Sequence, residues 1–263
     1  MRCGVDHYDQ LAGDSFDAGQ SMLIESFQLC MNRFLFHCGQ PSPTTVLDLG
    51  SGTGRFCPDL AEAFGGQVFG VEPSDSMRIY AQMHRPHARV SYQKGRAESI
   101  PLGRASCDLA ILYEMVHHVE DRAAMAGELA RVLRPGGRVI IGTRLRDQAD
   151  SPAWAKYFPQ AYELLKPRLP TIAELCAILE PAGFSYVTHE IADLLVAPSL
   201  KAYRERLSYL AISALTQLSR AELNHGFTLL ESAIAHDHEP GPIHAPIFFL
   251  VAERHIHAMP TGD

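Results

Sequence analysis

The chain has 263 residues, of which 46% are hydrophobic and 20% are charged, and its formal net charge is −7. This composition is typical of a soluble globular protein with one large domain, or with a core domain and an added subdomain. No run of Lys or Arg marks a surface for nucleic acid or for an anionic membrane, and no apolar run approaches the roughly 18 residues of a membrane span. We therefore expect no nucleic-acid or membrane partner. The composition says nothing about the oligomeric state.

The cysteines and the N-terminal sequence bear on the cellular compartment. The six cysteines form no CxxC pair and no zinc-type spacing, and no N-terminal stretch has the pattern of a secretory signal. We expect a cytoplasmic protein with reduced thiols. Five of the 13 histidines follow residue 235, but their spacing matches no zinc site, so we expect no metal ion.

Strands and helices alternate through the first half of the chain. Apolar periodicity predicts a helix over residues 21–38, ended by Gly39. Predicted strands then follow at residues 45–49, 67–71, 90–93, 109–112 and 138–143, with predicted helices up to about residue 64, over about 74–85, and over 121–133, where Arg134-Pro135-Gly136-Gly137 ends the last one. This order predicts an α/β fold with a doubly wound, mostly parallel sheet.

The second half contains two capping boxes. Thr171 and Glu174 open one predicted helix, and Ser219 and Glu222 divide a longer helical stretch in two. The last two strands are predicted over residues 184–189 and 247–252, so helices stand where a short hairpin would complete the sheet. We expect the segments at about 150–170 and 198–236 to form a helical cap. The predicted division is a lead-in or lid at 1–43 and one domain over 44–263.

Residues 46–56 read VLDLGSGTGRF, which predicts a buried strand, a glycine turn and a helix N-terminus. This arrangement suits a polar ligand, because glycines let the backbone approach it and the helix start offers free N–H groups. A dinucleotide-binding fold expects a third glycine where Arg55 stands. Glu72, after the next strand, suits the ribose of NAD or of an adenosyl ligand. Asp48 decides between them, because its carboxylate would repel a pyrophosphate and attract an ammonium group.

Four segments in order resemble the motifs of class I S-adenosylmethionine-dependent methyltransferases. They are VLDLGSGTGR, VFGVEPSDSM, GRAESIPL and LARVLRPGGRVII, and together they cover roughly residues 44–143. The resemblance implies a seven-stranded Rossmann-like fold, S-adenosyl-L-methionine as the cofactor, and methyl transfer to the O, N or C atom of a small organic acceptor.

The resemblance also implies a cofactor-binding set, made up of Tyr8, Asp48, Gly50, Gly52, Glu72, Met77, Ala97, Glu98 and Tyr113. The two glycines would let the turn pass under the ligand, Asp48 would bind its amino group, and Glu72 would accept from the ribose hydroxyls. Met77 would pack on the adenine.

Three further positions bear on the adenine end and the lid. Ala97 and Glu98 would frame the adenine edge, and Tyr8 resembles a lid tyrosine. Arg96 departs from the pattern, because many relatives carry Asp there and Arg can only donate hydrogen bonds.

A sulfonium methyl is already activated, so transfer depends on positioning and exclusion of water, with a base only where the acceptor loses a proton. Candidate residues follow the strand at 109–112, namely Tyr113, Glu114, His117 and His118. His117 or His118 is the candidate base, because the unperturbed pKa of His is roughly 6.5. The alternative is that these histidines only pack or shape the acceptor site.

The sequence also limits the acceptor. The turn after residue 111 reads LYEM, which lacks the Asn/Asp-Pro-Pro-Tyr pattern of amino-group methylation of bases or glutamine in this family, and the acidic cluster of metal-assisted catechol methylation is missing. Cys57 has no neighbouring cysteine for thiol-based metalloid chemistry, so we expect it to be structural. Trp154, Tyr157, Phe158 and Tyr203 are the predicted acceptor-pocket residues.

Other functions stay open at this point. The alternatives are a cofactor-binding regulatory or non-catalytic protein, an enzyme that makes non-methyl use of the same cofactor, and an oxidoreductase.

Overall fold

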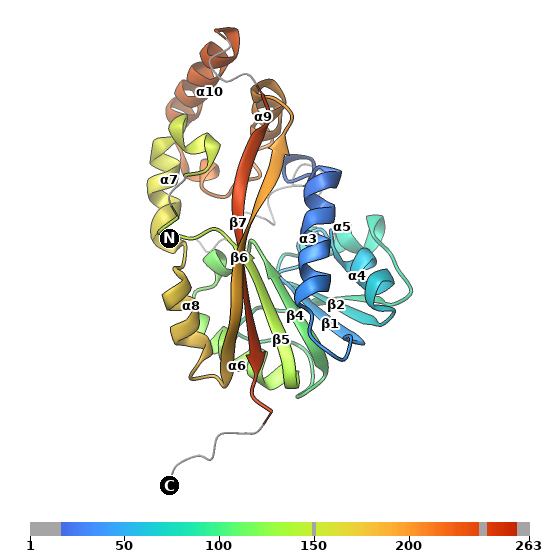
Figure 1. Ribbon diagram of the computed structural model, residues 1–263. Coiled ribbons are helices and arrows are strands. Elements are labelled where there is room, and N and C mark those ends of the chain that lie inside the picture. The colour runs from blue at the N-terminus through green and yellow to red at the C-terminus, as the bar shows by residue number, and fades with distance from the viewer. Residues whose placement is uncertain (1–16, 149–150, 237–240, 257–263) are drawn as a thin grey trace.

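The computed structural model describes residues 17–148, 151–236 and 241–256 (Figure 1). A seven-stranded sheet runs through them in the order β3-β2-β1-β4-β5-β7-β6. Strands β1 to β5 are parallel, and β7 is antiparallel to both of its neighbours. The strands are β1 Thr45–Leu49, β2 Gln67–Glu72, β3 Val90–Lys94, β4 Cys107–Tyr113, β5 Leu133–Thr143, β6 Phe184–Ala197 and β7 Ile243–Arg254. The predicted fold class, a doubly wound and mostly parallel seven-stranded sheet, is confirmed.

Helices connect the strands. They are α3 Ile24–His37, α4 Cys57–Phe64, α5 Asp75–His84, α6 Arg122–Val132, α7 Pro159–Leu165, α8 Ile172–Leu179, α9 Leu200–Leu207 and α10 Arg220–Ala235, with short 3-10 turns at Val116–His118, Ala153–Lys156, Lys166–Arg168 and Leu215–Gln217. Side-chain caps begin α5, α6, α8, α9 and α10. Both predicted capping boxes form, at Thr171 and at Ser219. None of the helices in the described ranges is long and apolar enough to cross a membrane.

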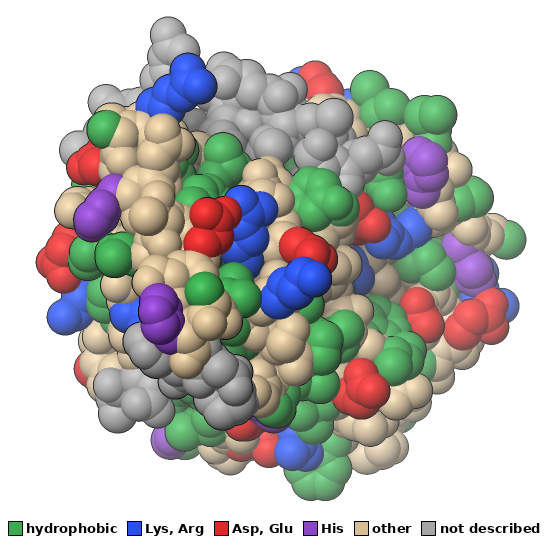
Figure 2. Space-filling view, turned by 90° about the horizontal axis from the view of Figure 1, so that it is seen from above, with side chains coloured by type: hydrophobic (Ala, Val, Ile, Leu, Met, Phe, Trp, Pro, Cys, Tyr) green, Lys and Arg blue, Asp and Glu red, His purple; other side chains and the backbone are tan. Residues whose placement is uncertain are grey.

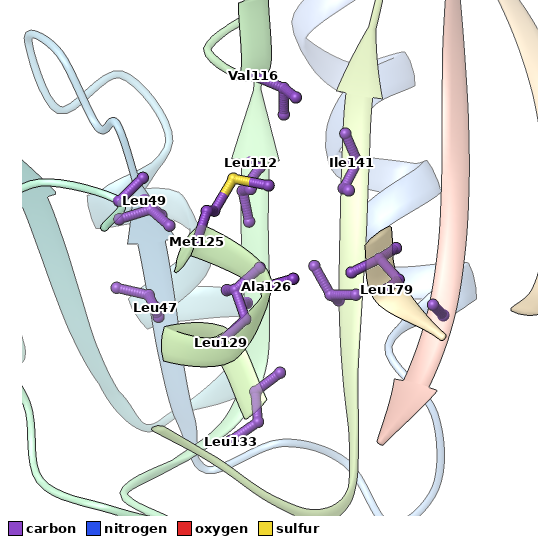
Figure 3. Packing of buried hydrophobic residues seen from close by; sticks show 14 of the residues in the cluster. Leu47, Leu49, Leu112, Val116, Met125, Ala126, Leu129, Leu133, Ile141 and Leu179 are labelled. Carbon is purple, nitrogen blue, oxygen red and sulfur yellow. The ribbon is translucent and has the colours of Figure 1, made fainter. Parts of the chain in front are cut away.

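The sheet is buried on both faces because alternate side chains of each strand point to opposite sides. On one face, Leu47 and Leu49 of β1 and Leu112 of β4 pack with Met125 and Leu129 of α6, as Figure 3 shows. The other face is covered by α3 and α4, whose buried side chains join those of β1, β4 and β7. Both faces of the sheet are therefore covered, and the residues at the carboxyl edge of the sheet are left to form a site.

Strands β5, β6 and β7 extend well beyond their predicted bounds, and β4 begins two residues earlier and ends one residue later than predicted. Leu133 has extended backbone and pairs with Cys107, so β5 begins at the last residue of the helix predicted over 121–133 and runs through the predicted turn at 134–137. Gly136, with φ of 77°, and a register shift in β4 accommodate this irregular start. Strands β6 and β7 are longer because they pair with each other well beyond the sheet.

Strands β6 and β7 form a two-stranded ribbon above the carboxyl edge. Only residues 248–253 of β7 pair with β5, whereas residues 243–247 pair with β6 alone. Helices α9 and α10 lie between the two strands in the chain, and Figure 1 shows them at the far end of this ribbon. The insertion has its own apolar cluster, which includes Trp154 and Phe158 from the other predicted cap segment.

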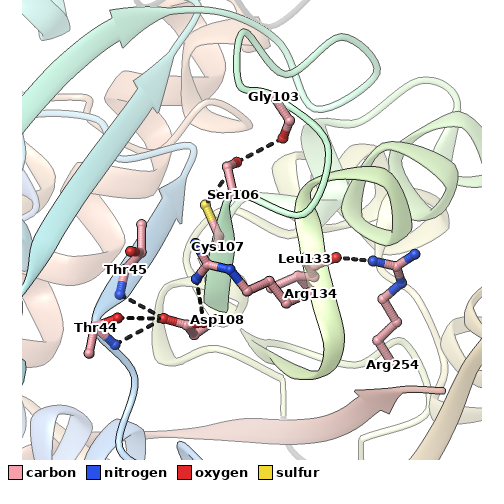
Figure 4. Close-up of polar contacts among 9 residues, drawn as sticks. All are labelled: Thr44, Thr45, Gly103, Ser106, Cys107, Asp108, Leu133, Arg134 and Arg254. Atoms are coloured by element: carbon pink, nitrogen blue, oxygen red, sulfur yellow. Dashed lines mark hydrogen bonds and ion pairs between the residues drawn. The ribbon is translucent and has the colours of Figure 1, made fainter. Parts of the chain in front are cut away.

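At the opposite edge, a polar cluster holds the start of β1 to β4 (Figure 4). Asp108 Oδ2 accepts hydrogen bonds from the backbone N–H groups of Thr44 (3.0 Å) and Thr45 (2.9 Å), and its Oδ1 is paired with Arg134. Arg254 donates to the carbonyl of Leu133. These contacts fix the register of the two strands whose far ends carry the site.

Candidate functional site

A cavity of about 310 Å³ lies at the carboxyl ends of β1, β2 and β4, where ligands bind in open α/β sheets. Its wall includes the glycine turn, the start of the β4–α6 connection, and residues of the α9 insertion. Figure 2 shows the molecule from above, the side from which the ribbon projects, with charged side chains of both signs interspersed among apolar ones.

The glycine turn between β1 and α4 needs glycine at two of the predicted positions. Gly50 and Gly52 have φ of 73° and 55°, a region that other residues rarely adopt. A Cβ atom on Gly50 would lie 2.8 Å from the Cβ of Met115. The backbone N–H of Gly50 donates to the carbonyl of Val71 at 2.8 Å, which ties the turn to β2.

Glu72 stands at the end of β2 with its carboxylate fixed by two backbone donors. The N–H of Gly52 donates to Oε2 and the N–H of Ser74 donates to Oε1, both at 2.9 Å. The side chain is buried and lines the cavity. Because a carboxylate oxygen accepts more than one hydrogen bond, this pre-oriented group can also accept from a pair of hydroxyls.

Asp48 presents a buried carboxylate beside the turn. It accepts a hydrogen bond from the Cys57 thiol, with 3.2 Å between Sγ and Oδ2. Burial raises the pKa of Asp48 to about 6. Burial, and then the neighbouring Asp48, raise the pKa of the Cys57 thiol well above its usual value. The thiol therefore stays protonated, which agrees with a structural Cys57, and Asp48 is left as a site for a cationic group.

The residues expected near adenine also line the cavity. Met77 is almost fully buried, and Ala97 and Glu98 lie on the loop after β3. Oε1 of Glu98 accepts from the backbone N–H of Glu120 at 3.2 Å, which orients this side chain. Arg96 lines the same cavity, and its side chain can only donate hydrogen bonds.

Tyr113 ends β4 inside an aromatic cluster. Its ring centroid lies 5.2 Å from that of Phe56 and 6.4 Å from those of Phe34 and Phe249. Burial raises the pKa of the Tyr113 hydroxyl well above its usual value. The side chain lines the cavity as a neutral phenol.

His117 has an environment that opposes its expected role as a base. Burial, together with the charges of Arg168, Arg144 and Arg122, lowers the pKa of His117 to about 3. Its Nδ1 is buried and has no hydrogen-bond partner among the described residues. His118 lies beside it, with ring centroids 4.1 Å apart, and both line the cavity. The lowered pKa makes His117 a neutral group near neutral pH, and its role as a base stays a prediction.

The four predicted acceptor residues divide into two pairs. Trp154 and Tyr203 line the cavity. Tyr157 and Phe158 are buried instead in the apolar cluster of the insertion, where the rings of Phe158 and Phe227 lie 5.2 Å apart. Tyr8, the predicted lid residue, lies outside the described residues.

Sequence reasoning missed three cavity arginines, Arg55, Arg144 and Arg206. Arg55 was considered only as a replacement for glycine, and the other two were not considered. Arg206 stands three residues after the buried Tyr203, so helical spacing does put it on the inner side of α9. That signal was available in the sequence.

Residues before α3 connect the glycine turn to the insertion. Asp17 pairs with Arg85 at 2.8 Å and accepts from the Thr53 hydroxyl at 3.0 Å. Two residues on, the carbonyl of Gly19 accepts from Nε of Arg206 at 2.8 Å, and Gln20 donates to the carbonyl of Ala211 at 3.1 Å. The cavity is thus bounded on this side by the segment that precedes α3.

The sequence of this chain matches known methyltransferases. Residues 47–141 match the family model of a methyltransferase domain. The chain is 31% identical over 169 residues to the O-methyltransferase cnsE of Penicillium expansum, covering 61% of this chain and 59% of that protein. It is 33% identical over 144 residues to the O-methyltransferase resE of Aspergillus sclerotiorum, covering 53% and 54%. The chain thus spans little more than half the length of these relatives.

Solved structures show the same fold at low sequence identity. The phosphoethanolamine N-methyltransferase 2 of Haemonchus contortus, solved with S-adenosyl-L-methionine, superimposes with a TM-score of 0.64 at 19% identity, covering 97% of this chain and 60% of that one. The 4+2 cyclase SpnF superimposes with a TM-score of 0.62 at 18% identity, covering 91% and 84%. Residues 47–141 thus match a methyltransferase domain, and the solved structures share the Rossmann-like fold and strand arrangement of this chain.

Proposed function

We propose that the protein transfers a methyl group from S-adenosyl-L-methionine to a small organic acceptor. The observation that carries the proposal is the Glu72 carboxylate, held by Gly52 and Ser74 at the cavity wall. The O-methyltransferase relatives support the same class of reaction. The cofactor supplies a methyl group on a positively charged sulfur, which an acceptor atom takes while S-adenosylhomocysteine leaves.

The cavity fits this cofactor at three places along its wall. Glu72 accepts from the ribose hydroxyls, because its carboxylate lines the cavity at the end of β2 and a carboxylate oxygen can accept more than one hydrogen bond. Asp48 accepts from the amino group, whose positive charge offsets the cost of burying a carboxylate. The side chain of Met77 and the backbone of Ala97 offer an apolar slot for a flat base.

The residues of this chain contribute positioning and exclusion of water more than proton transfer. Trp154 and Tyr203 enclose the acceptor, and the segment at Gly19 bounds the cavity from the N-terminal side. Neutral His117 accepts a hydrogen bond from the methyl acceptor. Because its pKa is about 3, the ring does not take up a second proton near neutral pH. Transfer to an acceptor atom that is ionised before it reacts needs no base at all.

Calorimetry of the purified protein with S-adenosylhomocysteine tests the proposal. The wild type is expected to bind S-adenosylhomocysteine and not NAD. The Glu72→Gln variant should bind it about 10- to 100-fold more weakly, because a hydrogen bond to a charged group contributes about 1.5–3 kcal/mol. Glu62→Gln is the matched control, since Glu62 is exposed on α4 and lies outside the cavity lining. Binding of NAD without S-adenosylhomocysteine would overturn the proposal.

A non-methyl use of the cofactor is the second candidate. It is favoured by the lowered pKa of His117 and by the likeness to SpnF, a cyclase with the same fold. Release of S-adenosylhomocysteine from S-adenosyl-L-methionine during turnover separates the two, because only methyl transfer forms it stoichiometrically with product.

A further inference from the structure

We propose that the acceptor carries an anionic group, a carboxylate or a phosphate, which binds between Arg55 and Arg206 while its apolar body lies against Trp154 and Tyr203. This inference rests on the proposed function and adds the class of acceptor. It starts from two guanidinium groups that line the same cavity, one from the glycine turn and one from α9.

Arg206 is held in place by neutral partners. Its Nε donates to the carbonyl of Gly19 at 2.8 Å, and its Nη1 donates to the carbonyl of Val196 at 2.7 Å. Both contacts fix the direction of the side chain without cancelling its charge. Burial lowers the pKa of Arg206 to about 10, and repulsion by Arg55 is the next cause. The guanidinium thus stays charged at neutral pH and Nη2 remains available as a donor.

Arg55 adds a second charge to the lining of the same cavity. Burial lowers the pKa of Arg55 as well. Among the residues that the structure describes, its guanidinium makes no ion pair, and the nearby Asp17 is already bound by Arg85 through both carboxylate oxygens. Keeping two half-buried, mutually repelling guanidinium groups charged raises the free energy of the ligand-free protein, and a bound anion offsets this repulsion.

Three carboxylates of the cavity have other hydrogen-bond partners, although the charge of Arg55 also acts on Asp48. Glu114 accepts from Arg144, both from its backbone N–H at 3.1 Å and from Nε at 3.4 Å. Glu72 is bound by backbone N–H groups, and Asp48 lies beside Cys57 on the cofactor side. None of the carboxylates in the described ranges forms an ion pair with Arg55 or Arg206.

The rest of this part of the cavity is apolar. It includes Trp154, Leu165, Leu169, Leu194, Leu207 and Ile212. An apolar wall with the guanidinium groups of Arg55 and Arg206 in the same lining is suited to a molecule with a hydrophobic body and one acidic group. A neutral acceptor would leave Arg55 and Arg206 without an ion-pair partner among the described residues.

Ligand titrations followed by NMR test the proposal, with benzoate and phenyl phosphate as anionic probes and benzamide as the neutral match of benzoate. They are run on the free protein and on the protein loaded with S-adenosylhomocysteine. We expect one anionic probe or both to bind at least tenfold more tightly than benzamide in both forms. The stronger of the two probes distinguishes a carboxylate acceptor from a phosphate acceptor. Equal binding of benzamide, or no binding of either anion, would overturn the proposal.

Arg55→Gln and Arg206→Gln should each weaken the anionic probe at least tenfold. Arg204→Gln is the matched control, because Arg204 lies on the same helix, pairs with Glu231 at 2.6 Å and is not part of the cavity lining. Arg206→Lys keeps the charge and should keep most of the binding. If Arg206→Gln fails to fold, Arg55→Gln carries the test, since it breaks no ion pair among the described residues.

A comparison of the affinities of two nucleosides tests whether Arg55 and Arg206 bind the carboxylate of the cofactor instead of the acceptor. S-adenosylhomocysteine has a carboxylate and 5′-methylthioadenosine has none. We expect the two variants to bind both nucleosides as the wild type does. A tenfold loss of S-adenosylhomocysteine alone would assign the pair to the cofactor and overturn the proposal. If the wild type binds no adenosyl ligand but still prefers the anionic probe, the proposed function fails and the anion site stands.

Discussion

The buried carboxylate of Asp48, which lines the cavity, makes the free energy of unfolding depend on pH. Burial raises its pKa to about 6 in the folded protein, above the ordinary value of 3.8. The folded protein therefore binds this proton more tightly than the unfolded chain does. By linkage, the free energy of unfolding falls as the pH rises from about 4 to about 6.

We predict that Asp48→Asn stabilises the ligand-free protein at pH 8 but not at pH 4. The expected gain at pH 8 is up to about 3 kcal/mol, from the shift of about two pKa units. Urea denaturation at the two pH values measures it, and Asp59→Asn on the exposed side of α4 is the control. Equal effects of Asp48→Asn at both pH values would show that the carboxylate ionises without cost.

We predict that His117 does not titrate between pH 5 and pH 8. Its low pKa of about 3 follows from burial and from three neighbouring arginines. NMR of the imidazole C–H groups over this range measures it, with the signals of His117 assigned by their loss in His117→Asn. A titration midpoint near the roughly 6.5 of an exposed histidine would restore His117 as a candidate base.

At the residue scale, the sequence predicts the cavity-lining residues of the glycine turn and of β2 better than those of the insertion. Gly50, Asp48 and Glu72 lie within or next to one strand–turn–helix unit, so their placement follows from local structure. Tyr157 and Tyr203 belong to an insertion whose packing depends on contacts between distant segments. Which of them reaches the cavity is decided by that packing and has no local signal.

At the scale of single elements, capping residues determine where helices begin. In α10, the Ser219 hydroxyl accepts from the backbone N–H of Glu222 at 3.3 Å, and the Glu222 carboxylate accepts from the backbone N–H of Ser219 at 2.7 Å. Both partners can be recognised in the sequence, which is why this boundary was predictable. The ends of β5, β6 and β7 were not, because they depend on pairing with distant strands.

We predict that Ser219→Ala lowers the free energy of unfolding by about 1 kcal/mol. The loss arises because an N–H group in the first turn of α10 is left without its acceptor. Chemical denaturation measures it. Ser232→Ala is the matched control, since Ser232 is exposed in the same helix and Ala is the better helix former. A similar loss in both variants would mean that the cap contributes nothing.

At the scale of the whole molecule, the sheet and its added segments have separate roles. The parallel strands place the glycine turn and Glu72 at one edge, and the Asp108 cluster holds the opposite edge in register. Helix α9, at the far end of the β6–β7 ribbon, adds Tyr203 and Arg206 to the lining of the cavity at the carboxyl edge. We propose that the sheet binds the cofactor and the insertion selects the acceptor.

The pairing of Glu72 with the ribose tests the central claim most directly. The measurement is the affinity of S-adenosylhomocysteine and of its 2′-deoxy analogue for the wild type and for Glu72→Gln, by calorimetry. We predict that the wild type loses about tenfold on removal of the hydroxyl and that Glu72→Gln loses much less, because the charged acceptor is already gone. Equal losses in the two proteins would contradict the assignment, since Glu72 and the ribose hydroxyl would then act independently.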